Sequence, residues 1–159
     1  MKIEIRPATL ADAPLVCAFI RELADYERLV DACEATPESV AATLFSPSPR
    51  AFCDIAEADG ESAGFALWFY SYSTFQAKRG IYLEDLYVRP QFRGRGLGRA
   101  LLAHLAKRAV GENCGRFEWS VLDWNTPSIA FYEALGAKPV SGWIRYRLDG
   151  EALARLADR

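Results

Sequence analysis

Residues Tyr82–Ala109 read YLEDLYVRPQFRGRGLGRALLAHLAKRA, and the fold follows from the order of the three parts in this stretch. A β-rich run ends at Val88, a loop with three glycines follows it, and leucines at helical spacing then indicate an amphipathic helix. Glycine lets the backbone adopt positive φ and approach a ligand closely. The first turn of a helix has unpaired N–H groups at the positive end of its dipole. The stretch therefore predicts an anion site where the loop meets the helix.

The spacing of the glycines separates this loop from two common nucleotide-binding motifs. A Walker loop requires Gly-Lys-Ser/Thr, and no such triplet follows here. A dinucleotide fingerprint requires G-x-G-x-x-G, but Arg99 or Leu101 stands where the third glycine is due. What remains is Arg-x-x-Gly-x-Gly, from Arg93 to Gly98. An ordinary strand-to-helix turn with glycines is the structural alternative.

Composition limits the class of protein. A chain of 159 residues with 51% hydrophobic and 25% charged residues is typical of one soluble folded domain, which we expect over residues 1–159. The net charge of −2 argues against a general nucleic-acid-binding protein, which would need a basic face. Arginines do gather around the glycine loop, at Arg89, Arg93, Arg95 and Arg99. Such a local cluster suits a small polyanion better than a duplex.

The cysteines and the N-terminus predict a reduced, metal-free protein. The four cysteines, Cys17, Cys33, Cys53 and Cys114, form no C-x-x-C pair, and His104 is the single histidine. A zinc site is therefore not expected. The opening residues MKIEIRPATL have no apolar signal core, and no run of 18 apolar residues exists. We expect a cytoplasmic protein with no membrane partner.

The order of predicted elements indicates an α/β fold. Strands are expected at Lys2–Arg6, Ala51–Glu57, Ala63–Ser73, Ile81–Val88, Phe117–Leu122, Ala137–Val140 and Ile144–Leu148. Helices are expected at 10–26, after the N-cap pair Thr36-Pro37, after the glycine loop, at Ser128–Leu135 behind a second such pair, Thr126-Pro127, and at Glu151–Ala157. These elements predict one mixed central sheet flanked by helices, with a parallel crossover from Tyr82 to Leu122. Ligands of such sheets bind at the carboxyl ends of the strands.

Three separated segments resemble one family. Tyr82–Val88 (YLEDLYV), Arg93–Gly98 (RGRGLG) and Trp124–Ala137 (WNTPSIAFYEALGA) are similar to the fourth strand, the acyl-CoA loop and the W-N-x-P-S-I-x-F-Y segment of the diamine (spermidine/spermine-type) branch of the GNAT N-acetyltransferase superfamily. The segments at Ile5–Thr9 and Glu22–Glu27 also resemble that branch. The resemblance implies a single-domain GNAT fold, acetyl-CoA as cosubstrate, no metal, and transfer of an acetyl group to a primary amine of a small molecule.

Two residues match the family's catalytic positions. A primary amine has a pKa near about 10.4, so it is mostly protonated at pH 7 and must lose a proton before it attacks a thioester. The resemblance implies that Glu84 takes this proton, directly or through water. In a regular strand, Asp85 would point to the opposite face. Tyr132 matches the general acid that protonates the leaving thiolate.

The resemblance also implies the binding residues. Backbone N–H groups of Leu86, Tyr87 and Val88 would hold the pantetheine like an added strand. The pyrophosphate would lie against Arg93, Gly94, Arg95, Gly96, Leu97, Gly98 and Arg99, and the pantetheine would also contact Asn125 and Ser128. The amine substrate would contact Tyr26, Glu27, Glu84 and Glu118.

Two departures from the family leave the acceptor open. The segment after Ala137 is shorter than in the animal polyamine enzymes, and the connection Thr74–Arg79 differs. In the family, these regions contribute to the substrate groove and to a homodimer interface. A polyamine, a diamine and a thialysine-like amino acid all remain candidate acceptors. The alternative functions are a non-catalytic acyl-CoA-binding regulatory module and an acetyltransferase for a different amine, such as a protein N-terminus.

Overall fold

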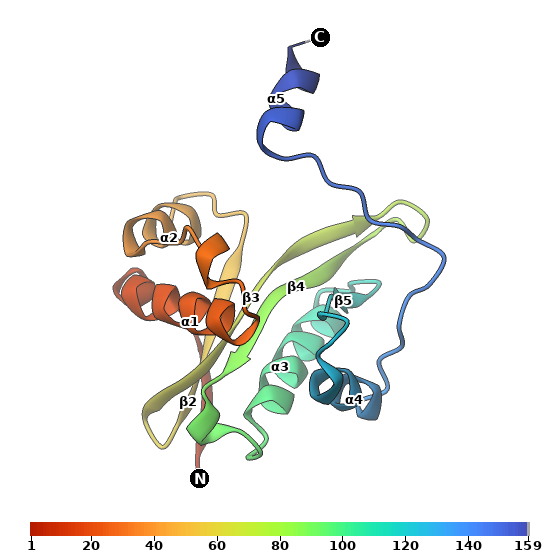
Figure 1. Ribbon diagram of the computed structural model, residues 1–159. Coiled ribbons are helices and arrows are strands. Elements are labelled where there is room, and N and C mark those ends of the chain that lie inside the picture. The colour runs from red at the N-terminus through yellow and green to blue at the C-terminus, as the bar shows by residue number, and fades with distance from the viewer. Residues whose placement is uncertain (159) are drawn as a thin grey trace. The chain divides into compact units, whose positions relative to one another are not determined.

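A five-stranded mixed sheet organises the larger of two units in the computed structural model, which describes residues 1–158 (Figure 1). Its strands, in spatial order, are β1 (Ile3–Pro7), β2 (Phe52–Ala58), β3 (Glu61–Ser73), β4 (Lys78–Val88) and β5 (Phe117–Trp119). Neighbouring strands are antiparallel except for β4 and β5, which are parallel. The predicted α/β fold with a mixed sheet and a parallel crossover is thus confirmed.

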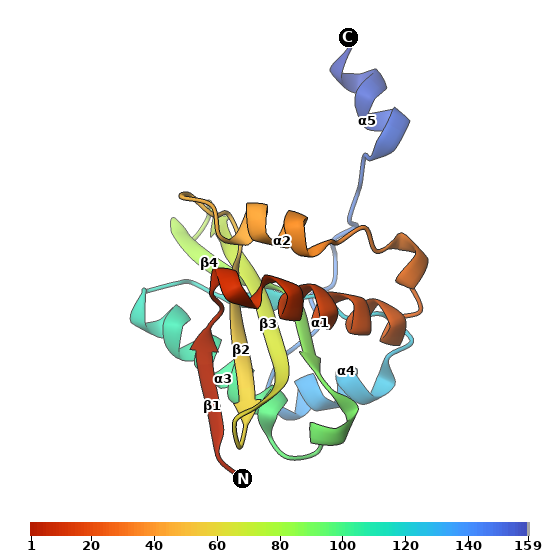
Figure 2. The same ribbon diagram turned by 90° about the vertical axis from the view of Figure 1, so that its left-hand side faces the viewer.

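Helices cover both faces of this sheet (Figure 2). In the unit Met1–Leu122 they are α1 (Ala13–Tyr26), α2 (Pro37–Leu44) and α3 (Leu97–Gly111), together with the 3-10 turns η1 (Leu10–Asp12), η2 (Val30–Ala32) and η3 (Pro90–Phe92). Phe19 of α1 stacks on Phe65 with ring centroids 5.3 Å apart, whereas Arg108 of α3 lies 5.1 Å over the ring of Trp68. Phe65 and Trp68 lie on opposite faces because side chains alternate along β3.

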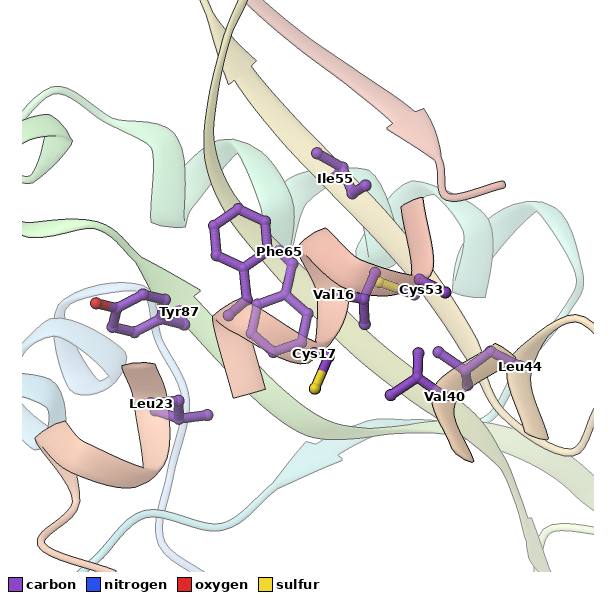
Figure 3. Packing of buried hydrophobic residues seen from close by; sticks show 11 residues of the cluster. Val16, Cys17, Leu23, Val40, Leu44, Cys53, Ile55, Phe65 and Tyr87 are labelled. Atoms are coloured by element: carbon purple, nitrogen blue, oxygen red, sulfur yellow. The ribbon is translucent and has the colours of Figure 1, made fainter. Parts of the chain in front are cut away.

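The core on the α1 and α2 face is apolar and closely packed (Figure 3). Val16 and Phe19 meet Ile55 and Phe65 of the sheet, and all four side chains are fully buried. Burying such a side chain contributes about 1.5–3 kcal/mol each, so this layer fixes how α1 sits on the sheet. Tyr87 lies at the edge of the cluster and thereby connects the core to β4.

Local signals of the sequence are largely confirmed. Thr36 caps α2, its hydroxyl accepting from the N–H of Ser39 at 3.1 Å, and Pro37 is the first helical residue. Asp59 and Gly60 both have positive φ, as the expected hairpin turn requires. The helix expected from residue 10 begins instead as the 3-10 turn η1, and α1 starts at Ala13.

The second unit, Asp123–Arg159, contains helices and no strand among its described residues. Its helices are α4 (Thr126–Ala134) and α5 (Gly150–Ala157), and both were predicted. The prediction of strands at Ala137–Val140 and Ile144–Leu148 is wrong, because residues 137–149 form neither helix nor strand. A strand exists only where a neighbour satisfies its N–H and C=O groups, and apolar alternation cannot show whether that neighbour is present. None of the helices described for residues 1–158 is sufficiently long and apolar to span a membrane.

Candidate active site

A single extra residue divides β4 into two halves. In the pairing with β3, Leu67 lies opposite Asp85 and Trp68 lies opposite Leu83, so Glu84 has no partner of its own and forms a β-bulge. The prediction that Asp85 and Glu84 occupy opposite faces assumed a regular strand, and β4 is not regular at this point. After the bulge, Asp85 lies on the same face as Leu67, the face that α1 and α2 cover.

The bulge reverses the direction of the hydrogen bonds along β4. The N–H of Ile81 points toward β5 and donates to the carbonyl of Arg116 at 3.1 Å. The N–H of Arg89 points the other way and donates to the carbonyl of Ala63 in β3 at 2.8 Å. In a regular strand these two residues, an even number apart, would point to the same side. The extra residue accounts for the change, and so Leu86 and Val88 direct their N–H groups away from β3.

Leu86 and Val88 direct their N–H groups to the side of β4 on which β5 pairs earlier in the strand, but β5 does not extend as far as these residues. The pairing between β4 and β5 runs only from Ile81–Phe117 to Leu83–Trp119, because β5 ends at Trp119 rather than at the predicted Leu122. Among residues 1–122, no strand continues this edge beyond the bulge. One acceptor there is occupied, since the side chain of Arg93 donates to the carbonyl of Val88 at 2.8 Å. We call residues Glu84–Val88 the open half of β4.

The glycine loop leads directly from the open half to the N-terminus of α3. Gly94 and Gly96 both have positive φ, at 73° and 87°, which favours glycine over any other residue. Gly96 is the N-cap and offers no side chain to the first turn, while Leu97 is buried and anchors the helix to the core. The N–H groups of this first turn have no partner within the helix. The local geometry therefore fits a phosphate group.

The four arginines near the loop divide into two pairs. Arg89 binds Glu22 at 2.9 Å and the carbonyl of Ser62 at 3.0 Å. Arg93 lies 4.9 Å over the ring of Tyr26 and 5.6 Å over the ring of Tyr87, so its side chain turns back toward α1. Arg89 and Arg93 thus hold the end of β4 in place. Arg95 and Arg99 are exposed and form no hydrogen bond or ion pair with any residue of 1–158.

Three carboxyl groups interact at the bulge. Burial, followed by the charges of Glu84 and Glu27, raises the pKa of Asp85 to about 7. Burial and the charge of Glu84 also raise the pKa of Glu27, which directly follows α1. A group of this kind attracts a cation and accepts a proton near neutral pH. Sequence reasoning missed Asp85, although two adjacent acids in a strand were a signal that either one could face the site.

The remaining predicted residues of the first unit lie around this acidic group. Tyr26 ends α1 and lies under Arg93, as described above. Glu118 lies opposite Tyr82 in the pairing of β4 with β5, and Arg116 binds it at 2.8 Å. Its carboxylate therefore already has a cationic partner, directly before its own strand. Among residues 1–158, no group of three or more His, Cys, Asp or Glu side chains is arranged to hold a metal ion.

In the second unit, the predicted site residues lie on α4. Asn125 is the N-cap, and its side-chain oxygen accepts from the N–H of Ser128 at 3.3 Å. The cap is therefore one residue earlier than the predicted Thr126, and Pro127 follows as the second helical residue. Tyr132 lies one turn further on, with its ring 5.4 Å from that of Phe131. Capping by Asn125 fixes where this helix begins and hence where Tyr132 stands on it.

Comparison with known proteins gives the family. Residues 18–137 match the acetyltransferase (GNAT) family. The thialysine N-epsilon-acetyltransferase of Bos taurus is 38% identical, over 99% of this chain and 98% of the relative. The spermidine/spermine N(1)-acetyltransferase-like protein 1 of Homo sapiens is 32% identical over 97% of this chain but only 24% of its own length. An integron cassette protein from the mobile metagenome of V. cholerae has a similar structure, with a TM-score of 0.84, 26% identity, and coverage of 100% of this chain and 99% of that one.

These similarities confirm the predicted family, its small-amine branch and the class of acyltransferase enzymes. The matched region contains β4, the glycine loop and α4, which are the segments on which the prediction was based. The chain therefore belongs to the acetyltransferase (GNAT) family.

Proposed function

We propose that this protein transfers the acetyl group of acetyl-CoA to a primary amine of a small molecule, by direct attack of the amine in a ternary complex. The observation that carries this proposal is the open half of β4, which presents two backbone N–H groups beside three interacting carboxyl groups. The two N–H groups can bind the amide-bearing arm of a thioester, and the three carboxyl groups can bind a cationic amine.

Acetyl-CoA would bind along the open half and the glycine loop. Its pantetheine amides would pair with Leu86 and Val88 as an added strand, and one of these N–H groups would polarise the acetyl carbonyl. Its pyrophosphate would lie at the first turn of α3, near Gly94, Gly96 and Gly98. Arg95 and Arg99 would supply charge, because they have no partner among the described residues. Leu97, and Arg93 through its contacts with β4, would position the loop.

The amine would be deprotonated by the acidic group. Glu84, with Asp85 and Glu27 beside it, would first attract the ammonium ion and then take one proton from it. The freed nitrogen lone pair attacks the thioester carbon and a C–N bond forms. The C–S bond breaks as the tetrahedral intermediate collapses, and the nitrogen loses its second proton to solvent. The products are the acetamide and the thiolate of CoA. Tyr26 and Glu118 would complete the substrate contacts.

Tyr132 would return a proton to the thiolate. This role is supported by the match of Trp124–Ala137 to the family segment and by the position of Tyr132 on α4. Asn125 and Ser128 would set the helix through their capping bond and would contact the pantetheine. A phenol of pKa about 10 donates to a thiolate whose acid has a pKa near about 8.5 only with help from its surroundings. We therefore propose that the surroundings of Tyr132 favour the transfer of its proton to the thiolate.

The proposed function also includes the acceptor amine, the cellular location and the oligomeric state of the protein. The relatives are named for a thialysine activity and for a resemblance to spermidine/spermine acetyltransferases, so an amino acid with a terminal amine and a polyamine are both candidates. All four cysteines are free thiols, which supports a cytoplasmic location. We further propose that the protein works as a homodimer, without a metal and without a nucleic-acid or membrane partner.

Thiol release from acetyl-CoA across a panel of amines tests this function. The panel contains spermidine, putrescine, thialysine, L-ornithine, L-lysine and a peptide with a free N-terminus. Turnover with the small amines and none with the peptide is the expected result. Turnover only with the peptide would assign a protein N-terminus as acceptor. Tight binding of acetyl-CoA by calorimetry without any turnover would contradict the enzyme and favour a regulatory acyl-CoA-binding module.

A further inference from the structure

A pocket of about 440 Å³ lies between the two N-terminal helices and the sheet. Its walls are mainly apolar and include Ile20 of α1, Val40 and Leu44 of α2, and Leu67 of β3. Arg50, in the loop between α2 and β2, is the one charged residue among the described residues that line it. An apolar pocket with a single cation in its wall suits a ligand with an aliphatic body and one anionic group.

The pocket adjoins the acidic group at the bulge. Leu67 lies directly opposite Asp85 in the pairing of β3 with β4, so their side chains are neighbours on one face of the sheet. Leu67 also lies opposite Cys53 of β2, which continues the same row across the sheet. Leu67, which lines the pocket, is therefore the residue that connects it to Asp85. A ligand that fills the pocket can direct one end toward the acids.

Arg50 lies just before β2, the strand at the other end of this row. It precedes Cys53 by three residues, so it is also offset from the row along the chain. The long arginine side chain covers part of this separation. Arg50 forms no hydrogen bond or ion pair within residues 1–158, whereas Arg6 and Arg89 each bind a carboxylate. Its guanidinium is thus available to an anion.

We propose that Arg50 binds the α-carboxylate of an amino-acid acceptor whose terminal amine reaches Glu27, Glu84 and Asp85, with the methylene chain in the pocket. The amine end of this assignment rests on the proposed function. Opposite charges at the two ends of an apolar pocket match a zwitterion with a flexible aliphatic chain. A polyamine would bring a second cation toward Arg50 and be disfavoured. Arg50 is therefore a specificity-determining residue, and it does not take part in the proton transfer.

Two matched pairs of amines separate the carboxylate from the chain that carries it. L-ornithine and putrescine have the same aliphatic chain between amine groups, with and without the carboxylate, as do L-lysine and cadaverine. We expect Arg50→Gln to raise KM for each amino acid by about 10–100-fold, the range for loss of a charge-assisted hydrogen bond. KM for each diamine should not rise, and it should fall because the repulsion between Arg50 and the second ammonium group is removed. Arg50→Lys should retain part of the preference, because it keeps the charge but loses the planar fork.

Lys107→Gln is the matched control variant. It also removes one positive charge, but from the exposed surface of α3 on the other face of the sheet, and it should leave both KM values unchanged. Equal effects of Arg50→Gln on amino acid and diamine, or no effect on either, would overturn the assignment while leaving the acetyltransferase intact.

Direct binding keeps the proposal testable if no amine is turned over. Calorimetry with L-ornithine, in the presence of CoA, needs no chemistry, and the difference between the unsubstituted protein and Arg50→Gln reports on the carboxylate contact. Binding to the unsubstituted protein that is weakened at least about tenfold in Arg50→Gln would support the assignment even if the proposed function fails. Absence of L-ornithine binding, or equal binding by both proteins, would overturn it.

Discussion

The two halves of β4 belong to one strand but have different surroundings. From Lys78 to Leu83 the strand pairs with β3, and Ile81–Leu83 also pair with β5 on the other side. After the bulge at Glu84, residues Asp85–Val88 pair with β3 alone. The first half therefore ends inside the sheet, whereas the second half is a sheet edge whose outward backbone N–H groups are not paired with a neighbouring strand. One bulged residue and one short neighbouring strand produce this difference, which shows how little a sheet must change to create a binding site.

The largest effect is expected at the bulge itself, where the open half carries the acids. Glu84→Gln should lower turnover by about 10²–10⁴-fold, because the amide cannot take the proton of the ammonium ion. Steady-state thiol release with a saturating small amine measures this. Glu61→Gln, at the start of β3, is a matched carboxyl-to-amide control and should have no effect. If Asp85→Asn is costly and Glu84→Gln is not, the base is Asp85.

Tyr132 tests whether α4 completes the chemistry of the open half. Tyr132→Phe removes only the phenolic hydroxyl, so turnover should fall by about 10²–10⁴-fold while acetyl-CoA affinity stays nearly the same. Calorimetry for affinity and thiol release for turnover give the two values. Full activity of the variant would remove Tyr132 from the role of general acid.

Two glycines allow the halves of β4 to be disturbed separately. A Cβ at Gly64 would collide with the backbone carbonyl of Tyr87, in the open half. A Cβ at Gly80, in the half of β4 from Lys78 to Leu83, would lie 2.9 Å from the carbonyl of Arg116. Both alanine variants should lose about 1–3 kcal/mol of unfolding free energy through overpacking. Only Gly64→Ala should also raise KM for acetyl-CoA, by roughly tenfold, because a shift of Tyr87 displaces Leu86 and Val88.

Denaturant unfolding measures the loss of stability in both variants. The KM for acetyl-CoA, measured by titration, distinguishes Gly64→Ala from Gly80→Ala. Equal increases in KM for Gly64→Ala and Gly80→Ala would mean that the open half has no special part in cosubstrate binding.

The smallest expected effect is on stability as a function of pH. Burial holds the pKa of folded Asp85 near 7, above its ordinary value of 3.8, so the folded state retains a proton that the unfolded chain loses. The unfolding free energy should therefore fall as pH rises from about 4 to about 7 and then level off. Asp85→Asn should remove most of this decline. Parallel curves for variant and unsubstituted protein, from urea unfolding at pH 4 to 8, would contradict the buried carboxyl.

Much of the fold could be predicted because its signals are local. The N-cap at Thr36, the turn at Asp59-Gly60 and the glycines before α3 each follow from the chemistry of one or two residues. The bulge at Glu84 has no such signal, because it arises from the register between β3 and β4. The inward position of Arg93 likewise depends on rings contributed by α1 and β4.

The site was predicted in part for the same reason. Motif spacing predicted the glycine loop and the family resemblance predicted Glu84. Whether an adjacent acid faces the same group depends on strand regularity, and so Asp85 was not included in the prediction. The pocket near Arg50 is lined by α1, α2, the loop before β2 and strand β3, and no stretch of sequence shows that they meet. The two C-terminal strands were expected from alternation alone, which cannot supply the neighbours that strands require.

Amide hydrogen exchange of β4, measured by NMR with and without acetyl-CoA, tests the open half most directly. We predict that the N–H groups of Leu86 and Val88 exchange rapidly in the free protein and become protected when acetyl-CoA binds. Tyr87 and Arg89, whose N–H groups face β3, should be protected in both states. Protection of Leu86 and Val88 without the cosubstrate, or continued rapid exchange at saturating acetyl-CoA, would contradict the assignment of this edge as the cosubstrate site.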